Sequence, residues 1–512
     1  MEANPLRSNR PGHSNPITPV VEIGLPIEQL DVSGDRCIDL YYKHFHRLHP
    51  FVVPRPWLER LAQDSSKQMS MQPLVAIMRY IGSLYCQSRQ AERLREEANN
   101  IFANGQHHSK DPFMIQAYLI NSIALYWCGD PVRSREEMDS AIHLALDLRM
   151  QHREFAATHC EGDPVLQESW RRTWWQIYIV DAYYAAMKHA PTYSTSDVEA
   201  TTELPCEESE YEGGTIPTPK TLDDFDSREF AADNHVYSSF AYLIGAIRGV
   251  SMALSCGLSK IQNTFPPQIL ETVDTVIEGW LLLLPKAKRQ LFSQSGEFDE
   301  LLFQAHMALH AATIGIHRQL SELLFDPLEI ISSCAPTPPQ ACTSKPNEYE
   351  SIHTTRCLKS IEAQVRLLAV PMRQVTHTPF VVCMLATGTI SLLAACKFHL
   401  TGQRLLVARH QIRMSIGHLK ALAEVWLQAE RSLSEIQTIA REVLGQQITQ
   451  QKQMQPNDGL NKPMAEEQAS GTMNDLYQNP VSDYLPQHSI EGLQAYFDLS
   501  DFCADQSWVA EY

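Results

Sequence analysis

The residues most able to do chemistry are charged side chains inside an otherwise apolar segment. Residues 168–186 read ESWRRTWWQIYIVDAYYAA, and Arg171, Arg172 and Asp181 could be taken for a catalytic set. On a helix, however, Asp181 would lie nearly three turns beyond Arg171. This spacing favours structural ion pairs over catalysis. Because an unpaired carboxylate is costly among apolar neighbours, we predict that Asp181 is buried and paired with a group from another element.

Three histidines, His306, His310 and His317, share one face of a predicted helix. Two histidines four residues apart could bind a metal ion, but the glutamate of a metalloprotease motif is missing. His317 would lie ~10 Å further along the helix axis. The pattern therefore favours histidines in the core or on the helix surface.

An acidic cluster, Asp223, Asp224 and Asp226, is similar to the magnesium-binding motif of helical terpene synthases. Ser227 stands where that motif needs its last carboxylate, and no second metal motif follows. Metal sites require ligand number and geometry together, so we do not expect this enzyme activity. The sequence shows no other catalytic constellation, and we predict that the protein is not an enzyme.

Twelve cysteines are scattered singly along the chain, without any Cys-x-x-Cys pair. A structural zinc site needs closely spaced thiolates, so the sequence predicts no metal and no other cofactor. Cysteines scattered in this way indicate reduced thiols in an intracellular protein. The net charge of −18 repels a phosphate backbone, which predicts weak or no direct binding of nucleic acid by this chain.

The segment that positions the charges is predicted to be a buried central helix. Asp163 is a candidate N-cap, Pro164 suits the first helical position, and Pro191 ends the helix. Glu168 precedes Arg172 by four residues, the favourable order for a helical ion pair. A helix with apolar groups around its circumference must be surrounded by other helices.

Helical patterns dominate the rest of the chain, and we predict an all-α fold, a single large multi-helix bundle. Asp-Pro pairs at 111, 130 and 163 each begin a helix. Further helices are expected to begin at Pro73, Ser227 and Pro267, and one is expected over residues 412–433. Two Asp-Pro starts are 33 residues apart, close to the tetratricopeptide period, but the repeat's other positions do not recur.

One apolar segment, residues 379–396, has no charge over 18 residues. It reaches the lower length limit for a membrane span, but it contains Thr387, Gly388, Thr389 and Ser391. A buried core helix explains it better than a membrane helix.

The bundle is predicted to have tails and one long loop. Residues 1–33 are expected to be a disordered tail, residues 34–445 the helical domain, residues 446–472 a flexible Gln-rich linker and residues 473–512 an acidic and aromatic tail. Residues 192–225, which are rich in acidic residues, Gly and Pro, predict a long surface loop within the domain.

The run WRRTWWQIYIVDAYYA, residues 170–185, resembles the signature of the fungal-specific transcription factor domain. This domain is the middle homology region of fungal zinc-cluster transcription factors. The segments DLYYKHFHRLHPFV (39–52) and LHAATIGIHRQL (309–320) are also similar to helices of that domain. The core of the motif comprises Trp170, Arg171, Arg172, Trp174, Trp175, Asp181 and Pro191. The family's Gly-Arg before this proline is replaced here by His189 and Ala190.

The resemblance implies a nuclear transcriptional regulator whose middle domain responds to a small-molecule effector or a partner protein, in a metabolic or secondary-metabolite pathway. The family's zinc cluster is not encoded in this sequence, so the expected partners are a coactivator, a DNA-binding protein or a second copy in a homodimer. No membrane partner is expected. A helical scaffold without a role in transcription is the alternative.

The C-terminal tail is the candidate activation segment. After Lys462 the sequence has no Lys or Arg, and aromatic residues alternate with carboxylates. Such segments insert aromatic groups into a partner groove, and Phe497, Phe502 and Trp508 are the candidate contacts. A passive solvated tail is the alternative interpretation.

Overall fold

The computed structural model describes residues 30–86, 90–103, 110–231, 235–256, 267–292, 296–335, 348–370 and 377–453. Within these ranges the regular structure is helical, and only isolated bridges, Leu204 with Lys220 and Phe292 with Phe298, occur in place of strands. The predicted all-α fold is confirmed. The predicted tail at 473–512, with Phe497, Phe502 and Trp508, lies outside the described residues, as does the first tail up to residue 29.

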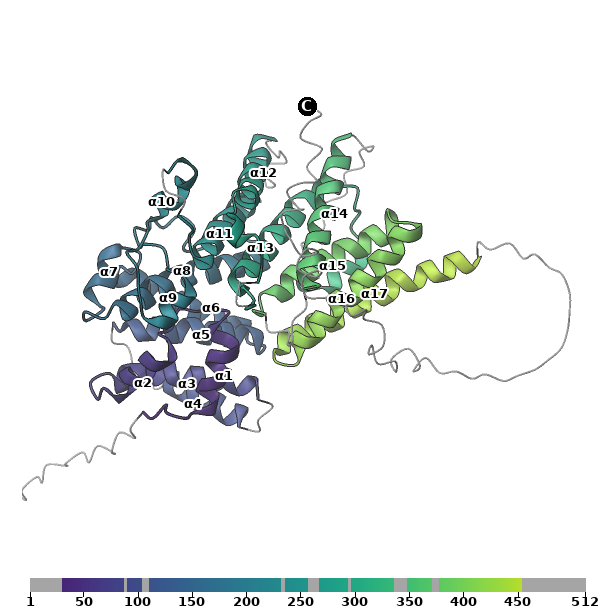
Figure 1. Cartoon of the computed structure of the whole chain (residues 1–512). Coiled ribbons are helices and arrows are strands. Elements are labelled where there is room, and N and C mark those ends of the chain that lie inside the picture. Colours follow the sequence, from purple (N-terminus) through teal and green to yellow (C-terminus); the bar gives the residue numbers. More distant parts are fainter. Residues whose placement is uncertain are drawn as a thin grey trace, which may run out of the picture.

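The helices follow one another closely along the chain (Figure 1). The first half contains α1 (Arg36–Leu40), a π-helical turn (Tyr41–His46), α2 (Arg55–Gln63), α3 (Gln68–Leu84), α4 (Ala91–Ala103), α5 (Pro112–Trp127), α6 (Pro131–Asp147), α7 (Arg153–Thr158), α8 (Pro164–Met187), α9 (Glu208–Gly213) and α10 (Leu222–Asp226). The second half contains α11 (Ser239–Ser255), α12 (Pro267–Leu282), α13 (Glu300–His317), α14 (Glu348–Leu368), α15 (Val381–Phe398), α16 (Gly402–Ala423) and α17 (Leu427–Gln453), with 3₁₀ turns at Arg228–Phe230, Lys286–Lys288, Arg318–Leu320 and Pro327–Ile331.

The three Asp-Pro pairs begin α5, α6 and α8 as the sequence predicts. The side chains of Asp111, Asp130 and Asp163 each accept hydrogen bonds from backbone N–H groups of the first turn. These N–H groups have no partner within the helix, so a capping carboxylate stabilises the start. The proline that follows has no N–H to satisfy and a φ angle that suits the helix.

Helix α8 is the centre of the first half. It packs against α5, α6, α7 and α11, and all its residues from Glu168 to Ala185 are buried. The predicted central helix is therefore confirmed. It ends at Met187, slightly before the predicted limit.

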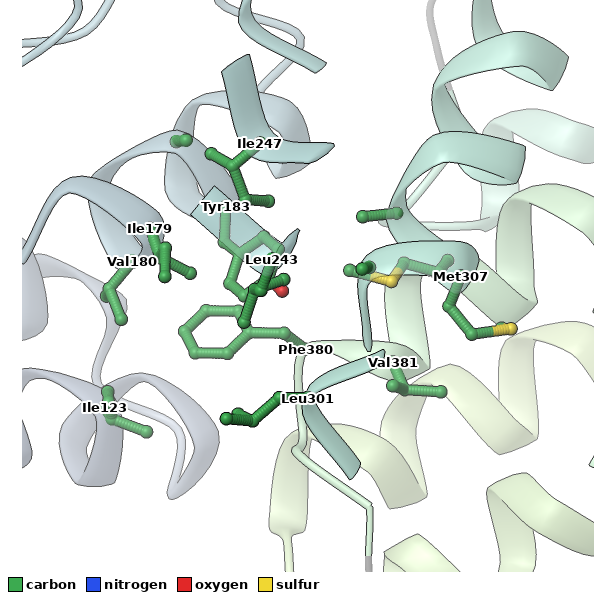
Figure 2. Close-up of a cluster of buried hydrophobic side chains, with 14 of the residues drawn as sticks. Ile123, Ile179, Val180, Tyr183, Leu243, Ile247, Leu301, Met307, Phe380 and Val381 are labelled. Carbon is green, nitrogen blue, oxygen red and sulfur yellow. The ribbon is translucent and has the colours of Figure 1, made fainter. Parts of the chain in front are cut away.

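The second half packs around α13, which contacts α11, α14 and α15. In Figure 1 the green helices α15–α17 lie to the right of α11 and α13, and the purple helices α1–α4 lie below α11. Phe380, which precedes α15, joins the two halves. Its ring lies 4.9 Å from that of Tyr183 in α8 and 5.6 Å from that of Trp127 in α5. Figure 2 shows Phe380 with Leu243 and other apolar side chains around it.

By length and composition alone, the 18 residues of helix α15 could cross a membrane. In the structure, however, 78% of this segment is buried inside the protein. It contacts α13, α14, α16 and α17. The prediction of a buried core helix is confirmed.

Several predicted boundaries are wrong. Pro73 lies inside α3, because packing of the fully buried Met71 extends the helix upstream to Gln68. The helix predicted from Ser227 begins at Ser239. The predicted helix over 412–433 is split between α16 and α17 by a turn that buries Trp426 against Tyr85.

The segment 192–225 is not only a surface loop. It contains α9 and the start of α10, and Leu204, Tyr211 and Phe225 are buried. Tyr211 packs against Arg172 of α8, and Phe225 packs against Tyr242 of α11. At the other end of the domain, α17 continues to Gln453, beyond the predicted domain end at Gly445.

Candidate functional site

The motif of α8 divides into a charged cluster in its second turn and an apolar cavity at its last turn. In the charged cluster, Arg172 is fully buried. Its guanidinium donates to Glu168 at 2.9 Å and Glu208 at 2.7 Å, and to the carbonyl oxygens of Pro50 at 3.0 Å and Cys206 at 2.8 Å. Arg172 therefore links α8 to the segment around Pro50 and to the 203–208 segment.

Arg171 completes the cluster. It donates to Glu168 and to Glu203, both at 3.2 Å. Glu168 also accepts the backbone N–H of Cys206 at 2.9 Å. Every charge here is matched by a protein group, so the cluster holds the 203–208 segment in place.

The electrostatics of Arg172 agree with this role. Although burial lowers the pKa of Arg172, the carboxylates of Glu208 and Glu168 raise it by more, so the guanidinium stays charged. Burial raises the pKa of Glu208 to about 7, and Arg172 opposes that rise. The guanidinium also lies 4.0 Å from the ring centroid of Tyr211, a cation–π contact.

The tryptophans of the motif are core side chains. Trp170 donates to the carbonyl of His159 at 3.0 Å, and Trp175 donates to that of Glu203 at 2.9 Å. Trp174 is buried with them. Their indole rings anchor α8 against α7 and the 203–208 segment.

Asp181 is buried and paired, as predicted. Its carboxylate accepts from Arg135 of α6 at 3.1 Å and from the backbone N–H of Thr195 at 3.0 Å. Burial raises the pKa of Asp181, and Arg135 opposes the rise. The sequence could not identify Arg135, because this residue lies 46 positions upstream on another helix.

The turn after α8 leads to Pro191 through a strained residue. His189 has a φ of 51°, in the left-handed region that favours glycine. Ala190 donates back to the carbonyl of Ala185 at 2.9 Å. Pro191 is half-buried in the bend that follows. His189 therefore holds a left-handed backbone conformation directly after α8, where glycine would be less strained.

A cavity of about 150 Å³ lies beside this turn, between α8, α11, α13 and α15. Its wall is formed by apolar and small side chains, with a few polar groups. Lining residues include Met187, Val250, Ala308, Ala312, Gly315, Ile316, Phe380 and Met384, with Tyr183, His189, Gln319 and Thr387 as polar members. No Asp, Glu, Lys or Arg is among the described lining residues. Such a cavity suits a small apolar ligand.

The cavity was not predicted from the sequence. One pattern could have suggested it, the small residues Ala308, Ala311, Ala312 and Gly315 along one side of α13. A run of small residues leaves space only if the facing helix does not fill it, and the sequence does not contain that information.

The remaining candidate residues are structural. His306 and His310 are buried with ring centroids 6.4 Å apart, while His317 bonds Asp274 and His353, each at 2.8 Å. In the described part of the chain no cluster of His, Cys, Asp and Glu could hold a metal ion.

The acidic cluster has its own partners. Asp224 takes part in the cap of α10 with Thr221, and Asp226 accepts from Arg248 of α11. Asp223, with its side chain exposed, lies in the first turn of α10.

The sequence profile described as "Fungal specific transcription factor domain" matches residues 38–248. The chain is also similar to the C6 finger domain transcription factor iacK of Pestalotiopsis fici, with 33% identity over 415 residues, which is 80% of this chain and 59% of the relative. The chain thus covers under two thirds of that relative's length. No solved structure matches.

The matched range contains the whole charged cluster of α8 and ends within α11. Helices α13 and α15, which form the other side of the cavity, lie beyond it. The cavity is therefore at the boundary between the matched range and the helices that follow it.

Proposed function

We propose that this protein is a nuclear transcriptional regulator of the fungal zinc-cluster type and not an enzyme, because residues 38–248 match the profile of the fungal specific transcription factor domain. Its middle domain responds to a small apolar effector, and its output depends on a coactivator. A DNA-binding protein or a second copy of the chain is a further partner under this proposal. The family match and the relative described as a transcription factor support it.

One observation carries the effector part of the proposal. The cavity is bounded on one side by α8 and α11 of the family domain and on the other by α13 and α15. A ligand there contacts both halves of the protein. Any ligand that binds only the folded arrangement stabilises it, by about 2.7 kcal/mol at a hundredfold excess over its Kd.

The lining defines the class of effector. A cavity of about 150 Å³ with mostly apolar walls takes a molecule the size of one aromatic ring. Without a charged side chain in the described lining, the ligand is expected to be uncharged. Tyr183, Gln319 and Thr387 supply polar groups that can orient it.

A reporter experiment tests the regulatory role. The full chain is fused to a heterologous DNA-binding module, and we expect transcription above the level of the module alone. Ala312→Leu, which fills the cavity, should change that output, whereas Ala157→Leu at an exposed position of α7 should not. A fusion that is folded but silent would favour the alternative of a helical scaffold without a transcriptional role.

DNA binding by this chain alone is expected to be weak. The net charge of −18 opposes contact with phosphates, so we expect no measurable complex with duplex DNA at about 0.15 M salt. An electrophoretic mobility shift assay with random and promoter duplexes measures this. A nanomolar complex at that salt concentration would contradict the expectation.

A further inference from the structure

Two cysteines in the cavity wall are in direct contact. Cys334 follows the 3₁₀ turn Pro327–Ile331, and Cys383 lies in the first turn of α15. Their sulfur atoms are 2.9 Å apart, although the residues are 49 positions apart in the chain. Both cysteines line the cavity between α8, α11, α13 and α15.

The surroundings hold the two thiols in place. Ser333, the neighbour of Cys334, donates its backbone N–H and its hydroxyl to Glu435 of α17 at 2.8 and 2.9 Å. Cys334 is buried and Cys383 is half-buried within α15. The short sulfur–sulfur distance is thus fixed by two packed elements.

The contact makes the two thiols unequal. The hydrogen bond with Cys383 lowers the pKa of Cys334, whereas the same contact raises the pKa of Cys383. The thiolate is the nucleophilic form of cysteine. Because its pKa is the lower of the two, we assign Cys334 as the attacking sulfur and Cys383 as the sulfur that reacts second.

Little movement is needed to join the sulfurs. A disulfide has a sulfur–sulfur distance of about 2.05 Å, so the gap must close by about 0.9 Å. Rotation of either side chain can supply part of this displacement. In the structure the two sulfurs are not joined by a disulfide bond.

We propose that Cys334 and Cys383 are a dithiol that a small hydroperoxide oxidises to a disulfide, and that this disulfide regulates the effector cavity. The regulatory part rests on the proposed function of the cavity. The chemical part does not depend on it.

The reaction balances in two steps. The Cys334 thiolate attacks the distal oxygen of the hydroperoxide and the O–O bond breaks, so that Cys334 becomes a sulfenic acid and the peroxide becomes an alcohol or water. The Cys383 sulfur then attacks the Cys334 sulfur, a disulfide forms and water leaves. The dithiol loses two electrons and two protons, and the peroxide gains them.

The first test maps the bond in the full-length protein. The protein is treated with hydrogen peroxide, free thiols are alkylated, and peptides are identified by mass spectrometry. We expect a Cys334–Cys383 disulfide that dithiothreitol reverses. If both cysteines remain alkylated while the protein is folded, the proposal is wrong.

Variants assign the order of the two steps. Cys383→Ser should stop the reaction at a Cys334 sulfenic acid that dimedone traps, whereas Cys334→Ser should leave Cys383 as a thiol. Cys396→Ser, which removes another buried cysteine of α15, should still form the disulfide. Dimedone labelling of Cys383 in Cys334→Ser would overturn the assigned order.

The second test links the dithiol to the cavity, with benzene as the probe. Saturating benzene should slow formation of the Cys334–Cys383 disulfide several-fold. The thiols of Cys37 and Cys86, which interact outside the cavity, should react with peroxide at an unchanged rate. Equal rates for Cys334 and Cys383 with and without benzene would refute the role of the cavity.

The outcomes separate the two proposals. A silent reporter fusion with a peroxide-induced disulfide would reject the transcriptional role and keep the dithiol chemistry. An active fusion whose Cys334 and Cys383 resist oxidation would reject the dithiol alone.

Discussion

The charged residues of α8 are compensated by partners on the same helix and by partners that are distant in the chain. Asp181 is compensated by Arg135 and Thr195, and Arg172 by Glu168 and Glu208. Removing one member of a buried pair leaves the other charge in the interior, which costs far more than the loss of a surface pair. The burial of an ion pair therefore decides how much the loss of one partner destabilises the fold.

We predict that Asp181→Ala lowers the free energy of unfolding by about 3 kcal/mol, because the buried N–H and hydroxyl of Thr195 lose their acceptor and Arg135 loses one of its two carboxylate partners. Asp139→Ala is the matched control, since Asp139 also pairs with Arg135 but is partly exposed, and it should cost less than about 1 kcal/mol. Urea denaturation followed by circular dichroism measures both. Equal losses in the two variants would contradict the argument.

Packing between elements depends on a few close approaches. Helices α1 and α3 approach so closely at Gly82 that an added Cβ would lie 1.8 Å from the backbone oxygen of Cys37. The connection between α16 and α17 likewise depends on the burial of Trp426. Helices α1 and α3, and the connection between α16 and α17, therefore cannot move without disturbing the packing of the core.

We therefore expect Gly82→Ala to lower the free energy of unfolding by about 2 kcal/mol or more, because α1 must move away from α3. Gly417→Ala inside α16 meets no atom within 4 Å and should raise stability by about 0.5–1 kcal/mol. Thermal or urea denaturation shows whether each variant is less stable or more stable than the wild type. A stabilised Gly82→Ala would show that α1 is not packed as described.

The acidic tail, residues 473–512, is the element proposed to contact a coactivator. Fused to a DNA-binding module, it should activate a reporter, because Phe497, Phe502 and Trp508 can insert into a partner groove. Replacing these three by Ala should abolish the activity, whereas replacing Gln494 and Gln506 should not. A silent tail, or an active triple variant, would identify it as a passive extension.

The whole molecule buries several histidines in its core. Burial lowers the pKa of His306 to about 4 and that of His49 and of His310 to about 3. The unfolded value is about 6.5. Below pH ~6.5 the unfolded chain thus binds more protons at these sites, and stability is lost as the pH falls toward 4. Glu137 and Glu208, whose pKa burial raises to about 7, act in the opposite direction.

We predict that His306→Gln reduces the pH dependence of the free energy of unfolding by up to about 1.4 kcal/mol per pH unit between pH 6 and 4.5. His143→Gln, at an exposed position of α6, should leave the slope unchanged. Urea titrations at several pH values provide the slopes. The same slope in wild type and His306→Gln would show that His306 does not remain neutral in the fold.

The sequence alone determined the local features. Asp-Pro pairs marked the starts of α5, α6 and α8, because capping and proline geometry act within one helical turn. The apolar circumference around Asp181 predicted its burial. The motif of residues 170–185 indicated the family, and the profile match at 38–248 agrees.

Only the tertiary structure decided which distant residues meet. It supplied Arg135 as the partner of Asp181, the turn at Trp426 that splits a continuous helical pattern, the cavity beside α13 and the contact between Cys334 and Cys383. Each depends on how helices far apart in the chain pack together. Helical periodicity determines which face of a helix is apolar, but the facing side chains decide whether that face is filled, paired or left open.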